Sequence, residues 1–231
     1  MNVIITGASK GIGKAIAVKF AGEGHPIFMC SRNAKHIEAT AAEIRNDFGV
    51  DVKARAADLS VKEEVFSFAD WCLQQGVPDV LVNNAGIYLP GNAMDEADGH
   101  MESIMNSNFY SAYHLTRRLI PSMIKSGQGH IFNICSTASL AAYDGGGSYS
   151  VSKFALHGLT KNLRHELKPR GIKVTGVYPG AVHTDTWGNF DNSNRRIMEA
   201  KDVADMVYAA AMLSLQAVVD DITMSPQLGE L

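Results

Sequence analysis

Tyr149 and Lys153 are the residues whose types and spacing suggest chemistry most directly. They are four residues apart, so on a helix they share one face. A free tyrosine has a pKa near 10, and only ~0.1% of it is phenolate at neutral pH. A neighbouring ammonium group is expected to lower that pKa, and each unit corresponds to about 1.4 kcal/mol. Such a tyrosine could exchange a proton with a substrate oxygen.

Ser136 adds a hydroxyl group that could hydrogen-bond the same oxygen. It follows an apolar, strand-like run, Ile131–Cys135, and a glycine-rich loop, Asp144–Gly147, lies between it and Tyr149. A Tyr and a Lys at helical spacing are common by chance. The three residues therefore need elements elsewhere in the chain that would bring them to one place.

The beginning of the chain predicts a nucleotide-binding turn. Val3–Ile5 is an apolar strand, Thr6–Gly13 is a turn with three glycines, and Lys14–Gly22 has helical periodicity. A glycine-rich turn between a strand and a helix lets backbone N–H groups approach a phosphate. The Gly-x-x-x-Gly-x-Gly spacing differs from the commoner Gly-x-Gly-x-x-Gly but works in the same way. We expect a dinucleotide here; the alternative is a turn that only permits tight packing of strand and helix.

Two cations favour NADP(H) as that dinucleotide. The second expected strand, Pro26–Cys30, leads into Ser31-Arg32-Asn33, where an NAD-selecting site needs a carboxylate for the ribose 2′-hydroxyl. The chain has Arg32 there instead, and Lys10 inside the glycine turn. Both side chains suit a 2′-phosphate; the alternative is two solvated surface charges.

Apolar runs and helical patterns alternate along the chain, which predicts an α/β fold with a doubly wound, parallel sheet and helices on both faces. The expected strands are 3–5, 26–30, 50–57, 79–82, 131–135, 173–177 and 221–224, and the expected helices are 14–22, 37–48, 61–74, 97–125, 149–168 and 202–215. Since no linker, repeat or low-complexity tract interrupts this order, residues 1–231 are expected to form one domain.

The carboxyl ends of the expected strands carry the candidate site. Ligands bind such sheets outside these ends. Each candidate segment follows a strand, so the topology would collect them on one edge: the glycine turn, Arg32, Asp58, Asn83–Gly86, Ser136 and Pro179–Thr184. Asp58 could cap the next helix or bond an adenine amino group. This convergence is the main physical reason to expect one site.

Composition limits the classes of function. The formal net charge of -3 gives no basic footprint for nucleic acid. No apolar run reaches the ~18 residues of a membrane span, and a strand at the very start leaves no room for a signal peptide. Three widely spaced cysteines, Cys30, Cys72 and Cys135, fit reduced, buried thiols of a cytoplasmic protein rather than a disulfide framework or a metal site.

Taken together, the motifs resemble those of the short-chain dehydrogenase/reductase family over nearly the whole chain. They occur in the family's order: T-G-x-x-x-G-x-G at Thr6–Gly13, N-N-A-G at Asn83–Gly86, Ser136 thirteen residues before Y-x-x-x-K at Tyr149 and Lys153, and P-G at Pro179–Gly180 with Thr184 four residues further on. The resemblance implies a Rossmann-like sheet of seven mainly parallel strands and a nicotinamide cofactor, NADP(H) from its basic residues.

The resemblance also implies catalytic roles. Tyr149 would be the general acid/base, Lys153 would lower its pKa and hold the nicotinamide ribose, and Ser136 would orient and polarise the substrate carbonyl. Asn108 matches a helix asparagine that anchors a water in the proton relay of the family. No role for a metal is implied.

Cofactor contacts are implied in the same way. Asp58 and Leu59 match the adenine-contacting pair, and Val182 and Thr184 match positions at the carboxamide and phosphate ends. The full implied set is Gly7, Ser9, Lys10, Gly11, Ile12, Gly13, Arg32, Asp58, Leu59, Asn84, Ala85, Gly86, Tyr149, Lys153, Pro179, Gly180, Val182 and Thr184.

The predicted function is hydride transfer between NADPH and a carbonyl/secondary-alcohol pair of a small molecule. One alternative is a non-catalytic dinucleotide-binding sensor or scaffold, against which the intact Ser, Tyr, Lys and Asn argue. Another is a dehydratase or epimerase, for which the site offers no additional acidic residue. The short length and the ending are similar to small bacterial members that reduce pterin side-chain ketones or oxidise β-hydroxy acids.

Three further expectations concern the surroundings of the site. Cys135 stands where many relatives have a second serine, and we expect a buried thiol without a catalytic part. The segment 185–198, with its Gly188-Asn189 and Asp191–Asn194 stretches, is expected to be a mobile flap with little structure of its own. The resemblance implies a homodimer or homotetramer that pairs through helices 97–125 and 149–168, often with the last strand.

Overall fold

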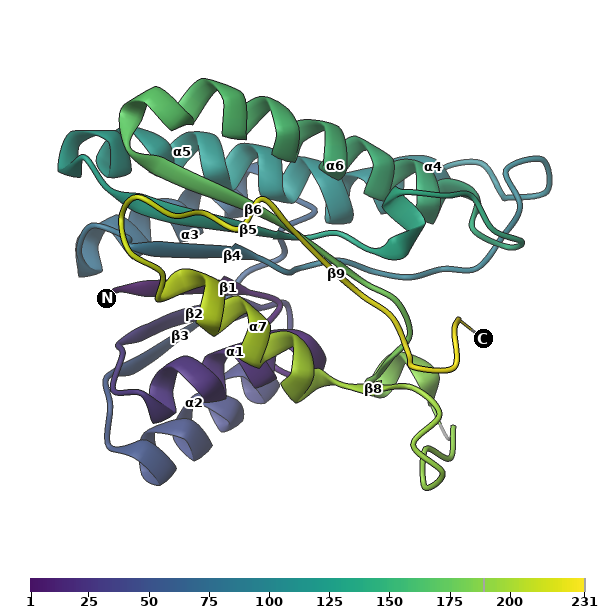
Figure 1. The fold of residues 1–231 in the computed structure, drawn as a ribbon, viewed down its shortest axis with the longest axis horizontal. Helices are drawn as coiled ribbons and strands as arrows, with labels where there is room; N and C mark the ends of the chain where they lie inside the picture. Colours follow the sequence, from purple (N-terminus) through teal and green to yellow (C-terminus); the bar gives the residue numbers. More distant parts are fainter. Residues whose placement is uncertain (189, 231) are drawn as a thin grey trace.

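The centre of the molecule is a sheet of seven strands, all paired in parallel (Figure 1). The structure is a computed structural model that describes residues 1–188 and 190–230. The strands are β1 (Val3–Thr6), β2 (Ile27–Ser31), β3 (Val52–Ala56), β4 (Val80–Asn83), β5 (Gly129–Ile134), β6 (Ile172–Pro179) and β9 (Asp221–Met224). Their order is β3-β2-β1-β4-β5-β6-β9, so the winding reverses between β1 and β4. Such a reversal is where α/β sheets bind ligands.

Helices cover both faces of this sheet (Figure 1). They are α1 (Gly11–Gly22), α2 (Ala34–Phe48), α3 (Lys62–Gln75), α4 (His100–Met105), α5 (Ser111–Ser126), α6 (Gly147–Leu167) and α7 (Ala200–Ala211). Val3 and Ile5 of β1 pack with α1, α2 and α7, whereas Ile4 packs with α3, α5 and α6. Because both faces of the central strands are buried, β1, β2 and β4 are apolar at every position but the last. The predicted fold class is confirmed.

Three elements differ from the prediction. The expected helix 97–125 is divided into α4, a π-helical turn at Asn106–Tyr110, and α5. Helix α7 ends at Ala211, four residues before the predicted end, because the following residues, Leu215 among them, are exposed and have no core to face. Two short strands, β7 (Val182–His183) and β8 (Met198–Glu199), pair in parallel and were not predicted.

Strand β5 contains a buried histidine, His130. Its Nε2 lies 2.7 Å from the hydroxyl of Thr175, and that hydroxyl donates its proton to the carbonyl of Val219 at 2.6 Å. Thr175 must therefore accept from His130, which assigns the neutral tautomer with the proton on Nε2. The other nitrogen, Nδ1, has no hydrogen-bond partner among the described residues. Burial lowers the pKa of His130 to about 3.

The depressed pKa of His130 predicts a pH-dependent stability. In the unfolded chain His130 takes up a proton below about pH 6.5, whereas in the native protein it stays neutral down to about pH 3. The free energy of unfolding should thus be highest above pH 6.5 and fall toward pH 3, by up to about 1.4 kcal/mol per pH unit from this group. Urea unfolding at several pH values between 7 and 5 would measure the slope. In His130→Gln the slope should be shallower than in the wild type; equal slopes would contradict the assignment.

Candidate active site

The glycine turn after β1 is held by the segment that follows β4. The hydroxyl of Thr6 accepts the backbone N–H groups of Asn84 and Ala85, each at 2.9 Å. The side-chain amide of Asn84 donates to the carbonyls of Thr6 and Gly7 at 2.9 and 3.1 Å. Gly7 has φ +64°, and a Cβ on Gly13 would overlap with the same amide. The two predicted motifs therefore form one structural unit.

A cavity of about 280 Å³ lies beside this unit, at the ends of β1 to β4. It collects most of the residues predicted for the adenosine half of a dinucleotide, including Lys10, Arg32 and Leu59. His36 also lines it and was not predicted. Its N–H is capped by Asn33 at 2.9 Å in the first turn of α2, one helical turn beyond Arg32. That spacing is the only signal in the sequence that could have indicated it.

Asp58 lines the same cavity but does not cap a helix. Its carboxylate accepts the N–H and the hydroxyl of Ser60 at 3.0 and 2.7 Å. Helix α3 begins after Val61, whose side chain cannot cap it. The capping alternative is thus wrong, while an adenine contact stays a prediction.

Tyr149 and Lys153 lie on α6, against the end of β5. Lys153 is buried, and its Nζ donates to the carbonyl of Ile134 at 2.9 Å. The same Nζ is 5.7 Å from the centre of the Tyr149 ring. The predicted one-turn spacing therefore does bring the phenol and the ammonium together, at the last residue of a strand.

Ser136 begins a short 3₁₀ turn, Thr137–Ser139, directly after β5. Its hydroxyl accepts the N–H of Ala138 at 3.1 Å, which leaves the hydroxyl proton for an outside acceptor. The buried Ser139 accepts the N–H of Ser136 at 3.2 Å, so it stabilises the turn. Ser150, next to Tyr149, donates to the carbonyl of Ala138 at 2.9 Å and ties α6 to this turn.

Asn108 is buried in the π-helical turn, and its side chain is fully engaged. It accepts the N–H of Ile87 at 2.7 Å and donates to the carbonyl of Ile87 and the hydroxyl of Ser152, both at 3.0 Å. A Cβ on Gly86 would lie 3.1 Å from its oxygen and 3.8 Å from the Nζ of Lys153. Asn108 therefore joins the segment after β4 to α6. The anchored water of the family remains a prediction.

Glu96 caps the helix that carries Tyr149, which the sequence did not indicate. Its carboxylate accepts the backbone N–H of Ser148 at 2.8 Å and the hydroxyl of the same serine. These hydrogen bonds hold the pKa of Glu96 below its usual range. Gly91 and Gly145 are also bonded, N–H to carbonyl, at 3.1 Å. The loops before α4 and before α6 are therefore joined beside Tyr149.

Two aromatic side chains, Tyr88 and Tyr143, lie near Tyr149 on these loops. The ring of Tyr88 meets that of Tyr149 edge-on, with centres 4.9 Å apart. Burial, followed by the neighbouring Tyr88, raises the pKa of Tyr143. Tyr88 and Tyr143 are partly exposed, as are Leu89 and Leu140 on the same loops.

The segment 185–198 has more structure than predicted. Asp185–Trp187 form a 3₁₀ turn, and Asp185 pairs with Lys10 at 3.2 Å. The side chain of Asn192 binds both backbone groups of Ile197, at 3.0 and 3.1 Å. Asn189, part of the predicted flexible stretch, lies outside the described residues.

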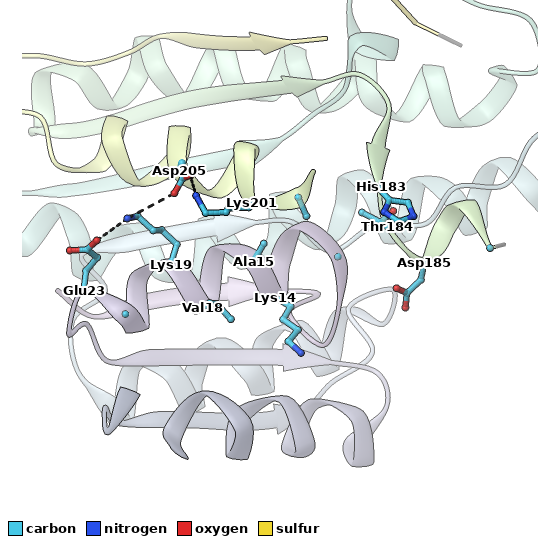
Figure 2. A pocket seen from close by; sticks show the side chains of 14 residues that line it. Lys14, Ala15, Val18, Lys19, Glu23, His183, Thr184, Asp185, Lys201 and Asp205 are labelled. Atoms are coloured by element: carbon cyan, nitrogen blue, oxygen red, sulfur yellow. Dashed lines mark hydrogen bonds and ion pairs between the residues drawn. The ribbon is translucent and has the colours of Figure 1, made fainter. Parts of the chain in front are cut away.

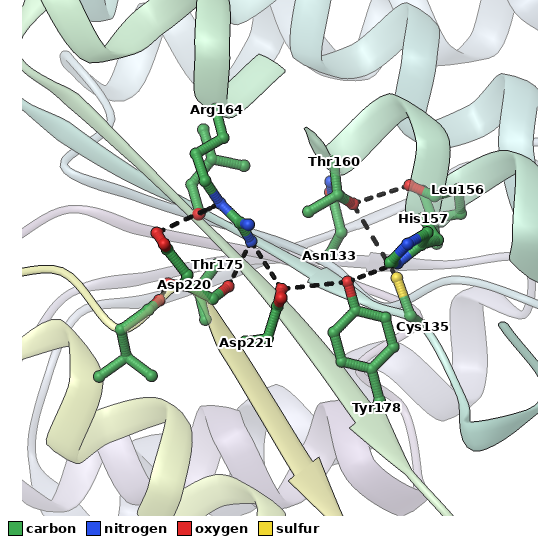
Figure 3. Close-up of polar contacts among 12 residues, drawn as sticks. Asn133, Cys135, Leu156, His157, Thr160, Arg164, Thr175, Tyr178, Asp220 and Asp221 are labelled. Atoms are coloured by element: carbon green, nitrogen blue, oxygen red, sulfur yellow. Dashed lines mark hydrogen bonds and ion pairs between the residues drawn. The ribbon is translucent and has the colours of Figure 1, made fainter. Parts of the chain in front are cut away.

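The far end of α6 is fixed to the edge of the sheet by polar side chains (Figure 3). Arg164 donates to the carboxylate of Asp221 at 2.7 Å. Tyr178 donates to the same carboxylate at 3.2 Å, and its hydroxyl lies 2.8 Å from Nδ1 of His157. Near them, Cys135 is buried, as predicted, and burial raises the pKa of its thiol to about 11. Helix α6 is thus held at both ends.

A larger cavity, about 680 Å³, lies elsewhere, between α1 and α7 (Figure 2). It touches the predicted cofactor contacts only at Gly11 and Thr184. Each lysine along it is paired with a carboxylate, as for Lys19 with Glu23 at 2.7 Å. Ser136, Tyr149 and Lys153 line neither this cavity nor the one beside the glycine turn.

Residues 1–188 and 190–230 contain no group of three His, Cys, Asp or Glu side chains that could bind a metal ion. No helix there combines the length and apolar character that crossing a bilayer requires. The three cysteines are free and buried.

Comparisons with known proteins show the family of the chain. The family model described as short chain dehydrogenase matches residues 1–195. Sepiapterin reductase of Chlorobaculum tepidum is 33% identical, over 99% of this chain and 97% of its own. A metagenomic short-chain oxidoreductase solved with NADP has 30% identity and a TM-score of 0.87, covering 98% of this chain and 97% of that one. L-Sorbose reductase of Gluconobacter frateurii, solved with NADPH and L-sorbose, has 26% identity and a TM-score of 0.87, covering 96% and 94%.

These matches extend over the same segments that form the fold and the site. The family model covers β1 to β7, including the glycine turn and α6, and the relatives cover nearly the whole chain. The chain therefore belongs to the short-chain dehydrogenase family of oxidoreductases.

Proposed function

We propose that this protein is an NADP(H)-dependent oxidoreductase that interconverts a carbonyl and a secondary alcohol of a small molecule. One observation carries the proposal: Lys153, Tyr149 and the turn of Ser136 are tied together at the end of β5. They are joined through Asn108 and Gly86 to the cavity that contains Lys10 and Arg32.

The residues present fit a dinucleotide with a 2′-phosphate. Gly7 and Gly13 let the turn before α1 pack tightly against Asn84 and Ala85, where a Cβ would overlap its neighbours. Lys10 and Arg32 line the adjoining cavity, and the one carboxylate there, Asp58, is engaged by Ser60. Relatives solved with NADP or NADPH support the same choice. When bound, NADPH would supply the hydride.

The side chains of this chain would handle the proton. In reduction, the phenol of Tyr149 gives its proton to the carbonyl oxygen as the carbonyl carbon is reduced, so that ketone plus hydride plus proton gives alcohol. Ser136 donates its free hydroxyl proton to the same oxygen and orients it. Lys153 places a positive charge beside the phenolate that forms. No described feature favours the alternative, a non-catalytic dinucleotide sensor.

The substrate would bind among the partly exposed side chains around Tyr149. Tyr88, Leu89, Leu140 and Tyr143 offer apolar and aromatic surface, which favours a substrate with an apolar or aromatic group next to its carbonyl. A relative named sepiapterin reductase supports including pterin ketones among the candidates. A panel of ketones, aldehydes and hydroxy acids, followed at the absorbance of NADPH, would identify the class.

Replacing the proton donor gives the most direct test. In Tyr149→Phe we expect turnover to fall by roughly 10²- to 10⁴-fold, because the phenol proton is lost, while the Kd for NADPH stays unchanged. Steady-state kinetics and NADPH fluorescence titration would measure the two. Tyr110→Phe, at an exposed residue of the π-helical turn, is the matched control and should retain activity. Retained turnover in Tyr149→Phe would refute the mechanism.

Cofactor choice tests Arg32 separately. In Arg32→Asp we expect the ratio of kcat/KM for NADPH over NADH to fall by about 10- to 100-fold, since charge-assisted hydrogen bonds contribute about 1.5–3 kcal/mol. Lys35→Asp makes the same change of charge on α2 at a residue that does not line the cavity, and should alter the ratio little. An unchanged ratio in Arg32→Asp would show that Arg32 does not bind the 2′-phosphate.

We also propose a homodimer or homotetramer that pairs through α5 and α6. Tyr110, Val151 and Phe154 are apolar or aromatic and more than two-fifths exposed on this side of the molecule. Light scattering after gel filtration should give two or four times the mass of one chain. Phe154→Glu should reduce that mass, whereas Met206→Glu, on α7, should not. A wild-type monomer would refute the proposal.

Two further parts of the proposal concern the whole chain. One sheet contains strands from both ends of the sequence, which supports a single domain over residues 1–231. Three free, buried cysteines support a reducing compartment such as the cytoplasm.

A further inference from the structure

The end of the chain lies on the loop that follows β6. This loop starts at Gly180, whose N–H donates to the carbonyl of Met224 at 2.8 Å. Six residues later the tail returns to it: the carboxylate of Glu230 accepts the N–H of Ala181 at 3.0 Å. The carboxylate occupies the space that a Cβ on Gly180 would need. A residue at the end of the sequence is therefore in contact with the segment predicted to bind the nicotinamide end of the cofactor.

A second segment holds the tail in this position. The guanidinium of Arg196 donates to the carbonyls of Gly229 and Glu230, both at 2.9 Å. Arg196 belongs to the segment 185–198, which sequence analysis predicted to be mobile. Because its partners are backbone carbonyls, Arg196 fixes the course of the main chain at Gly229 and Glu230.

Ala181 is the residue on which these contacts converge. Its N–H donates to Glu230, and its carbonyl accepts the N–H of Met198 at 3.1 Å. The next residue, Val182, then pairs with Met198 where β7 meets β8. Both backbone groups of Ala181 are therefore occupied, one by the tail and one by the strand that follows Arg196. Loop, tail and the segment 185–198 form a closed ring of contacts.

We propose that Glu230 and Arg196 are positioning residues for the nicotinamide end of the bound dinucleotide. By fixing Ala181, they set the backbone direction of Val182 before the cofactor arrives, which reduces the ordering that binding must impose. This inference rests on the proposed function, in which Val182 contacts the carboxamide end. Neither residue touches the reacting atoms.

Two ligands that differ only at the nicotinamide would test it. NADPH contains both halves of the dinucleotide, and 2′-phospho-ADP-ribose contains the adenosine, its 2′-phosphate and the pyrophosphate but no nicotinamide. For Glu230→Ala and Arg196→Ala, calorimetric titration should show NADPH binding weakened by about 10-fold, with 2′-phospho-ADP-ribose bound as by the wild type. Glu230→Gln keeps an oxygen acceptor, so its affinity for NADPH should lie between those of the wild type and Glu230→Ala.

Controls and contrary outcomes follow from the same titrations. Gln227→Ala, on the exposed part of the tail, should bind both ligands normally. The double variant Glu230→Ala/Arg196→Ala should bind NADPH no more weakly than Glu230→Ala, because the two residues act through one contact. Unchanged NADPH binding in Glu230→Ala, or equal weakening of both ligands, would overturn the inference alone. A wild-type chain that binds neither ligand would overturn the proposed function along with it.

Discussion

The buried ammonium group of Lys153 is the constraint on which the rest of the site depends. Only 6% of this residue is exposed. A charge in such a place is costly unless acceptors are aimed at it. The carbonyl of Ile134 provides one at 2.9 Å, at the last residue of β5. Helix α6 must therefore cross the sheet at that point, and the position of Tyr149, one turn earlier, follows from it.

Polar side chains inside the fold hold that crossing in register. Asn83 of β4 donates to Asn133 of β5 at 2.8 Å and to Thr116 of α5 at 2.9 Å. Asn133 in turn donates to Thr160 of α6 at 2.8 Å. A chain of amides and hydroxyls thus connects both long helices to the central strands. Apolar packing would allow the helices to slide, whereas hydrogen bonds of this kind have a single geometry.

Features that depend on local pattern could be predicted from the sequence. The seven strands, the glycine turn and the spacing of Tyr149 and Lys153 all follow from periodicity or from residue types at fixed distances. The π-helical turn around Asn108 could not, because a single turn is shorter than the window from which apolar periodicity is read. Glu96 and Glu230 were missed for another reason. Each caps backbone about fifty residues away in the sequence, and no short window contains both partners.

The hydrogen bond between Ala181 and Glu230 has a practical consequence for handling the protein. The two termini lie at opposite sides of the molecule (Figure 1). A tag attached close to Glu230 would lie beside the loop after β6, whereas a tag before Met1 would leave from the other end of the sheet. Expression vectors should therefore carry the tag on the amino-terminal side, and crystals for cofactor soaking are best grown from chains without a tag next to Glu230.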